Sequence, residues 1–177
     1  MKVLPDQDFW LDGGSMFGIV PKALWSRRMA PDEQNRIRLT TNCVLVERGG
    51  DWLLIEAGLG DMLPAKERGY LNVRPGPTLL DRLVDSGVGP EDVRWVVLTH
   101  LHYDHAGWCT RPDGSGGFTP TFPKAEYVVQ ARQLAEATYP SRRERGSYMG
   151  QTIEPVTRAG LWRAVEGIAE AAPGVRV

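Results

Sequence analysis

Short runs of apolar residues alternate along this chain with polar and glycine-rich stretches, and they predict a succession of strands and helices. The strongest run is Val93–Leu98, which is mostly apolar and leads directly into polar residues. Short apolar runs bounded by turn residues are typical of buried strands. The pattern therefore predicts a strand that delivers a polar cluster to its carboxyl end, formed by Thr99, His100, His102, Asp104 and His105.

Two further patterns precede that strand. Residues Arg36–Glu47 and Asp51–Glu56 are separated by a turn that contains a glycine pair, which predicts a β-hairpin. Residues Thr78–Ser86 predict a helix, in which Thr78 caps the first turn and Asp81 completes a capping box. Strand, helix and strand in this order predict a βαβ unit, whose functional side chains gather at the carboxyl ends of the strands.

Other segments give weaker signals. Met1–Trp10 predicts a strand interrupted by a proline. Ala125–Gln130 predicts another strand, and the apolar spacing in Ala131–Tyr139 predicts a short amphipathic helix. Glycine and proline punctuate Gly58–Pro77 and Arg111–Pro123, so we expect loops there.

The polar cluster after the strand has the composition of a metal site. Residues two apart in an extended backbone point the same way, so His100 and His102 can close on one ion while Leu101 turns into the core. Asp104 and His105 follow where the strand gives way to a loop or a helix, and that bend directs them toward a second ion. Imidazoles with a carboxylate suit zinc or another borderline divalent metal better than calcium or magnesium.

A structural role is the ordinary explanation for an isolated histidine or aspartate at a strand end. Here the chain contains three histidines, and all of them fall between His100 and His105. Crowded imidazoles repel one another when protonated unless a cation holds them. The crowding therefore favours metal binding.

Three stretches resemble the metallo-β-lactamase-fold hydrolases. His-x-His-x-Asp-His after an apolar strand and a threonine resembles the signature of that family. Trp52–Gly60 resembles its strand that ends in an acidic residue and glycine, with Glu56 where aspartate is commoner. Leu11–Trp25, together with Pro31–Ile37, resembles the branch that includes the quorum-quenching acyl-homoserine lactonases. The resemblance implies an α/β fold, the metallo-β-lactamase-type αβ/βα sandwich, of which this chain supplies mainly the first sheet-and-helix half.

The number of ligands bears on the extent of the domain. A catalytic zinc usually takes three protein ligands, whereas His100 and His102 offer two to one ion and Asp104 and His105 two to the other. In the family the remaining ligands, a His, a bridging Asp and a further His, come from the second half of the domain. We therefore expect residues 1–177 to form a metallo-β-lactamase-like domain that is incomplete at its C-terminus, about half to two thirds of a longer enzyme.

Two lines of argument give different secondary structures for the residues from Leu161 to Val177. Apolar residues from Leu161 to Ala169 have helical spacing. The resemblance implies strands at Leu161–Val165 and Gly174–Val177 instead, and we follow the resemblance.

The resemblance also implies an activity. It predicts a metal-dependent hydrolase that holds two divalent ions, zinc in the first place with manganese or iron as alternatives, and uses a metal-activated water to open a lactone or a similar ester. Asp104 would anchor the second ion and take a proton from the attacking water. Glu56 and Thr99 would lie behind the ligands, with Glu56 orienting an imidazole; the alternative for Glu56 is a strand-end carboxylate in water.

The segment Leu11–Met29 is rich in glycine and large apolar residues. Such a segment can pack over a substrate pocket or simply cover the core as an N-terminal flap, and composition does not separate the two. The resemblance favours a pocket, with Met16, Phe17 and Trp25 as substrate-contacting residues that grip an acyl chain.

Composition sets limits on the remaining possibilities. A chain of 177 residues with a formal net charge of −1 is expected to form one ordinary globular domain, without nucleic acid or membrane as a partner. The resemblance implies a small-molecule ester or lactone as its partner, and a homodimer stays open. Cys43 and Cys109 are expected to be reduced, and a cytoplasmic location follows by default. The basic run Arg142–Arg145 is expected to be a solvated face.

Three competing functions stay open. A single-iron enzyme of sulfur or oxygen chemistry uses a similar scaffold, and its iron content would distinguish it. A nucleic-acid hydrolase shares the motif, but the near-neutral charge offers no basic track. The third is a non-catalytic fragment that lacks the second half of the metal site.

Overall fold

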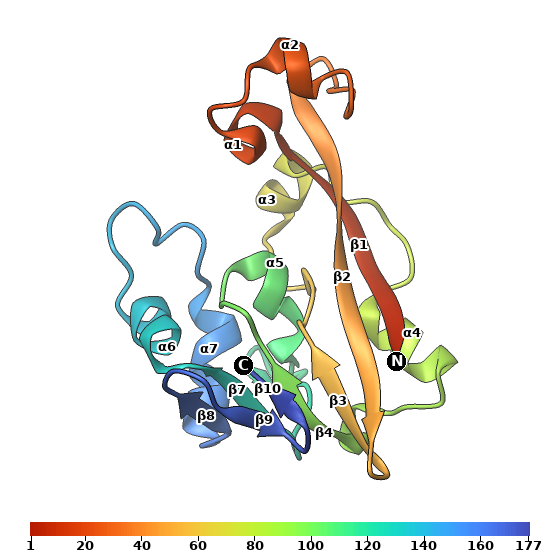
Figure 1. The fold of residues 1–177 in the computed structure, drawn as a ribbon, viewed down its shortest axis with the longest axis vertical. Helices are drawn as coiled ribbons and strands as arrows, with labels where there is room; N and C mark the ends of the chain where they lie inside the picture. The colour runs from red at the N-terminus through yellow and green to blue at the C-terminus, as the bar shows by residue number, and fades with distance from the viewer. The chain divides into compact units, whose positions relative to one another are not determined.

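The structure, a computed structural model, describes residues 1–177 (Figure 1). Strands, α-helices and 3₁₀ helices follow one another along the chain as β1 (Lys2–Asp12), α1 (Gly13–Phe17), α2 (Lys22–Trp25), β2 (Arg36–Arg48), β3 (Asp51–Ile55), α3 (Ala65–Tyr70), α4 (Leu79–Asp85), η1 (Pro90–Asp92), β4 (Val93–Val97), α5 (Tyr103–Ala106), η2 (Gly107–Cys109), β5 (Thr110–Pro112), β6 (Phe118–Pro120), β7 (Glu126–Gln130), α6 (Ala131–Thr138), α7 (Gly150–Arg158), β8 (Trp162–Val165), β9 (Glu170–Ala172) and β10 (Val175–Arg176).

Contacts divide the chain into two compact units. The larger unit comprises Met1–Asp6, Thr41–Met62 and Pro77–Val177. The smaller unit comprises Gln7–Thr40 and Leu63–Gly76. The histidine motif lies entirely within the larger unit.

A mixed sheet of six strands, in the order β1-β2-β3-β4-β7-β8, organises the chain. Strands β2 and β3 pair antiparallel. The pairs β3–β4, β4–β7 and β7–β8 are parallel. Parallel neighbours require crossover connections, which α4 provides between β3 and β4. The α/β fold predicted from the sequence is confirmed.

Local signals explain the elements that lead to the motif. The β2–β3 hairpin turns at Gly49 and Gly50, whose φ values of 63° and 91° are easily adopted only by glycine. Helix α4 begins with the predicted capping box, in which Thr78 and Asp81 satisfy each other's backbone N–H groups. Both predictions are therefore confirmed at the level of the individual turn and cap.

The sheet carries a hydrophobic cluster on each face. Leu53 and Leu54 follow each other on β3 and belong to different clusters, because successive side chains of a strand point to opposite faces. Leu54 packs with residues of α4, α6 and α7. Leu53 packs with Ala171 and Ala172 of β9. The layers give β4 a buried position, so the residues that follow it are held by a rigid strand.

The structure corrects several sequence predictions. Strand β1 runs through Pro5 without interruption, since it lies at the edge of the sheet, where a missing N–H is tolerated. The predicted loop Arg111–Pro123 contains the β5–β6 hairpin, and the predicted loop Gly58–Pro77 contains α3. Helix α7 was not predicted. It contains Pro155, a residue type that is unfavourable in the interior of a helix.

The tail follows the strands that the resemblance implies. Strand β8 pairs parallel with β7, and β9 pairs antiparallel with β10. Tertiary pairing therefore outweighs the helical spacing of the apolar residues after Leu161.

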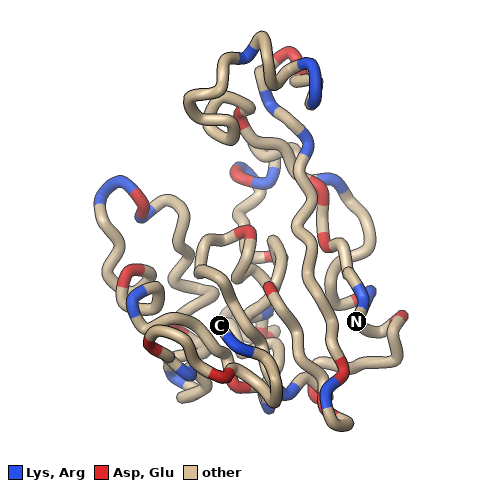
Figure 2. The backbone as a smooth tube through the Cα atoms, viewed as in Figure 1, with Lys and Arg blue, Asp and Glu red and all other residues tan.

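Charged residues of both signs are interspersed along the chain (Figure 2). The arginines between α6 and α7, Arg142, Arg143 and Arg145, are exposed, as expected for a solvated face. None of the helices combines the length and apolar character that crossing a bilayer requires.

Candidate metal centre

The histidine motif spans an irregular segment and a short helix. Strand β4 ends at Val97, so His100 lies beyond the strand rather than on it. His102 precedes α5 in an extended conformation, and its carbonyl accepts hydrogen bonds from His105 and Ala106 at 3.0 and 2.9 Å. Asp104 therefore lies in the first turn of α5 and His105 one residue further along. The predicted bend between the two halves of the motif is present.

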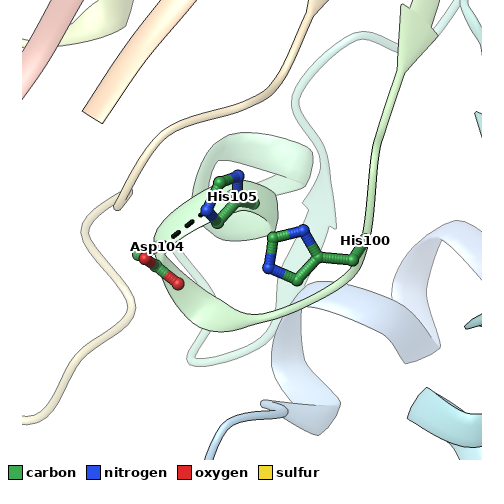
Figure 3. Close-up of side chains that lie close together, drawn as sticks. All are labelled: His100, Asp104 and His105. Atoms are coloured by element: carbon green, nitrogen blue, oxygen red, sulfur yellow. Dashed lines mark ion pairs between the residues drawn. The ribbon is translucent and has the colours of Figure 1, made fainter. Parts of the chain in front are cut away.

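Three side chains of the motif converge (Figure 3). His100, Asp104 and His105 each offer a ligand atom, and these atoms lie within 4.8 Å of one another. Nε2 of His105 is 3.6 Å from Oδ2 of Asp104, and the ring centroids of His100 and His105 are 4.0 Å apart. His102 lies beside this group, with its ring edge-on to His100 at 4.6 Å.

Nδ1 of His105 and Nδ1 of His100 each contact a neighbouring side chain of the protein. Nδ1 of His105 is 3.0 Å from Oε2 of Glu56, and Nδ1 of His100 is 2.9 Å from Oγ1 of Thr99. Oε1 of Glu56 accepts the backbone N–H of Thr99 at 3.0 Å. These contacts leave Nε2 as the remaining ring nitrogen on both His100 and His105. A carboxylate or hydroxyl behind a ring is the usual way in which a ligating histidine is oriented.

Glu56 reaches this position through an unusual backbone conformation. It follows β3 with a φ of 65°, which is uncommon for a residue other than glycine and occurs preferentially at functional sites. Its side chain is 13% exposed. Glu56 therefore lies against the motif and not in open water.

The loop after Glu56 is tied to α5 by backbone hydrogen bonds. Ala57 donates to the carbonyl of His105 at 2.7 Å and accepts from Trp108 at 2.7 Å, and Gly107 donates to Gly58 at 2.8 Å. These bonds need close backbone contact, because a Cβ on Gly107 would lie 2.0 Å from the carbonyl oxygen of Leu59. The loop and the ligand helix are thus one packed substructure.

Asp6 also supports this loop through hydrogen bonds, and sequence reasoning missed it because its partners lie far away along the chain. Its carboxylate is buried and accepts hydrogen bonds from Leu59 N–H at 2.8 Å, Leu79 N–H at 2.7 Å and Trp108 Nε1–H at 3.0 Å. Burial raises the pKa of Asp6, and these donors oppose the rise. Asp6 therefore links β1, α4 and the loop beside the motif.

The histidines that face each other differ in their electrostatics. Burial lowers the pKa of His100, and the neighbouring His105 and His102 lower it further. Burial also acts to lower the pKa of His105, but the hydrogen bond to Glu56 and the charges of Asp104 and Glu56 outweigh it and raise the net pKa. The two rings therefore have different surroundings, since carboxylates dominate those of His105 and burial dominates those of His100.

The residues predicted to contact substrate lie in the smaller unit. Trp25 is 3% exposed and stacks on Phe17 with centroids 5.0 Å apart, and Met16 is exposed. Trp25 also lies directly against Gly13, where a Cβ would be 2.4 Å from its ring. Trp25 is thus a core residue of this unit, and Met16 offers more free surface.

The remaining candidates are simpler. Cys43 and Cys109 are free and buried, in agreement with the expected reduced thiols, and burial raises the pKa of both. Leu101 is fully buried, as predicted for the residue between two ligands.

Sequence reasoning missed Gln133 and Tyr148, which contact the motif from α6 and from the segment before α7. Neither carries a local signal, because only the fold brings them close.

The donor set fits a borderline divalent cation. Two imidazole nitrogens and one carboxylate oxygen match the ligands of zinc and its neighbours in the transition series. The rings of His100 and His105 are held from behind, as such ligands require. The arrangement can therefore hold a metal ion with its ligands oriented in advance.

The chain is similar in sequence to known metal-dependent hydrolases. Residues 36–159 match the metallo-β-lactamase superfamily. An N-acyl homoserine lactonase of Bacillus thuringiensis is 28% identical over 152 residues, which are 80% of this chain and 53% of that protein. This chain thus spans about half the length of the curated relatives that it matches.

Two solved structures show the same fold. A probable metal-dependent hydrolase from Staphylococcus aureus is 29% identical with a TM-score of 0.88, over 99% of this chain and 62% of that one. An N-acyl homoserine lactone hydrolase, solved with the product N-hexanoyl-L-homoserine at its catalytic metal centre, has a TM-score of 0.67 at 22% identity, over 98% of this chain and 62% of that one. The second similarity shows the fold alone.

Proposed function

The chain belongs to the metallo-β-lactamase superfamily, and on that premise we propose that it provides part of the metal centre of a hydrolase that opens a lactone or a similar ester. The observation that carries the proposal is the convergence of His100, Asp104 and His105, whose ligand atoms lie within 4.8 Å of one another. Glu56 and Thr99 contact the far side of the two rings. The group has the features of a ligand set and not of a surface cluster.

The proposed site holds two divalent ions, zinc in the first place with manganese or iron as alternatives. His100 and His102 would bind one ion, and Asp104 and His105 the other. Because the His100 and His105 rings are in contact and the Asp104 carboxylate is close to both, the two pairs form one continuous set of donors. Any further imidazole ligand has to come from outside these residues, since the histidines of the chain are all in the motif.

Metal ions in such a site lower the pKa of water and polarise a carbonyl group. The chain's own residues would contribute positioning and proton transfer. Asp104 is the proposed catalytic residue, because a carboxylate beside the reacting water can accept its proton. Glu56 would hold the His105 ring so that Nε2 points toward the ions, and Thr99 would do the same for His100.

The choice of a lactone rests on the relatives. The relative from Bacillus thuringiensis is an N-acyl homoserine lactonase, and one structural neighbour was solved with N-hexanoyl-L-homoserine. An acyl chain needs an apolar contact surface, and we propose that Met16 and Phe17 supply it with Trp25 as their support. Quorum quenching would be the corresponding biological role.

Metal analysis and hydrolysis assays test the proposal together. The purified protein is expected to bind zinc, manganese or iron in elemental analysis, and His100→Ala and His105→Ala are expected to lose most of that metal while remaining folded. The variant Asp85→Asn serves as a control, because Asp85 is an exposed carboxylate on α4, a helix that carries none of the proposed ligands.

Substrate choice is measured with N-hexanoyl-homoserine lactone, an aryl ester and a phosphodiester. Lactone opening that disappears on chelation supports the proposal. Metal content that is unchanged in both histidine variants, or hydrolysis of the phosphodiester alone, would contradict it.

A further inference from the structure

The segment between the end of β4 and the start of α5 carries two of the proposed ligands without the support of a strand. Leu101, which separates His100 from His102, donates its backbone N–H to Oε1 of Gln133 on α6 at 3.2 Å. Its side chain is fully buried. The backbone between the two histidines is therefore fixed by one side-chain acceptor and one core contact.

Gln133 is itself held in one orientation. Its Oε1 also accepts the hydroxyl of Tyr148 at 3.2 Å, and its Nε2 donates to Oε2 of Glu136 at 3.3 Å. An amide whose oxygen receives two donors and whose nitrogen faces a carboxylate cannot be reversed without loss of all three contacts. Tyr148 and Glu136 thus orient Gln133 toward the Leu101 N–H.

Tyr148 makes a second contact with the motif. Its ring is edge-on to the His102 ring, with centroids 4.9 Å apart at 69°. The His102 ring is also edge-on to the His100 ring, with centroids 4.6 Å apart. The carbonyl of Ser147 accepts the N–H of Tyr103 at 2.9 Å, so the segment that carries Tyr148 is tied to the first residue of α5. The His102 imidazole therefore contacts two rings, those of His100 and Tyr148.

We propose that Tyr148 and Gln133 are positioning residues for the proposed metal ligands His100 and His102. Gln133 fixes the backbone between them, and Tyr148 both orients Gln133 and limits the position of the His102 ring. Glu56 and Thr99 position the rings of His105 and His100 by contacts with Nδ1. The His102 ring is positioned by its edge-on contact with the Tyr148 ring. We call Gln133 and Tyr148 together the brace. The inference rests on the proposed metal site, because the brace affects function only if these imidazoles bind a cation.

Zinc affinity, measured by competition with a chromophoric chelator, tests the brace without an activity assay. Tyr148→Ala is expected to weaken zinc binding about 10-fold or more, the usual effect of removing a partner of a ligand. Tyr148→Phe keeps the ring and is expected to restore most of that loss. Gln133→Ala is expected to weaken binding without altering the ring contact. Tyr139→Ala is the matched control, since Tyr139 is 86% exposed and lies at the end of the same helix.

Two further readouts separate positioning from general destabilisation. Thermal unfolding of each metal-free variant shows whether the fold is retained, and if Tyr148→Ala fails to fold, Gln133→Ala carries the test. The visible spectrum of the cobalt-substituted protein reports ligand geometry, so it is expected to change in Tyr148→Ala and in Gln133→Ala but not in Tyr139→Ala.

The outcomes distinguish the brace from the metal site itself. A wild-type protein that binds no zinc overturns both proposals. A wild-type protein that binds zinc, with folded Tyr148→Ala and Gln133→Ala variants of equal affinity and unchanged cobalt spectra, overturns the brace alone and leaves the proposed function intact.

Discussion

Oε2 of Glu56 lies 3.0 Å from Nδ1 of His105, across 49 positions of sequence. The other oxygen of the same carboxylate accepts the N–H of Thr99, immediately before His100. Glu56 therefore contacts both halves of the histidine motif at once. Glu56 follows the last residue of β3 and has a left-handed backbone conformation.

This relationship predicts the effect of removing the negative charge. Glu56→Gln has one acceptor oxygen in place of two, so it cannot serve both Thr99 and His105. We expect zinc affinity to fall about 10- to 100-fold in a chelator competition assay. Glu47→Gln, at an exposed position on the same hairpin, is the control. Equal affinity in both variants would show that Glu56 does not orient a ligand.

The two facing histidines are expected to titrate on opposite sides of 6.5, the ordinary pKa of the imidazole. In the metal-free protein, NMR titration is expected to find the pKa of His105 raised and that of His100 lowered. The raised pKa of His105 stabilises the fold below pH 6.5, and this contribution is lost as the pH rises through the folded-state value. The lowered pKa of His100 acts in the other direction, because protonation below pH 6.5 then favours the unfolded chain. Titration of His100 above His105 would contradict the assignment of their partners.

The proposed proton acceptor can be tested with a substitution of nearly equal shape. Asp104→Asn keeps the size of the side chain but removes its charge and its basicity. We expect kcat for lactone opening to fall at least about 100-fold, the contribution typical of a positioned general base. Thermal unfolding of Asp104→Asn checks that the fold is retained, because the Asp104 side chain is only 23% exposed. An Asp104→Asn protein as active as Asp85→Asn would remove Asp104 from the mechanism.

The packed loop beside the ligands predicts a difference between two glycines. Gly107→Ala introduces a Cβ 2.0 Å from a backbone oxygen, so we expect the free energy of unfolding to fall by about 1–3 kcal/mol. Gly69→Ala faces open space in α3 and is expected to raise stability by about 0.5–1 kcal/mol. Chemical denaturation of both variants makes the comparison. A Gly107→Ala protein as stable as the wild type would mean that the loop is loosely packed.

Local chemistry explains how much of the fold was predictable. The β2–β3 hairpin depends on a glycine pair, and α4 depends on the contact between Thr78 and Asp81. Both signals act within a few residues, so they are visible in the sequence. The β5–β6 hairpin also has a local signal, since the Asp113 carboxylate accepts the N–H groups of Ser115 and Gly117 in its turn, but its strands are only three residues long. Helix α7 has no comparable signal, and its Ile153 and Val156 are buried in a core cluster built from distant elements. The prediction that residues 1–177 form one domain stays a prediction.

For the site, the sequence by itself determined the identity of the donors, because the spacing His-x-His-x-Asp-His crowds all the histidines of the chain into one segment. Only the tertiary structure decided how they are used. In the structure, β4 ends before His100, and His100 lies close to Asp104 and His105. Glu56 contacts His105, and Tyr148 contacts His102. The physical reason is that spacing along the chain sets which side chains are near one another. The direction of each imidazole depends on hydrogen bonds and ring contacts from strands and helices far away in the sequence.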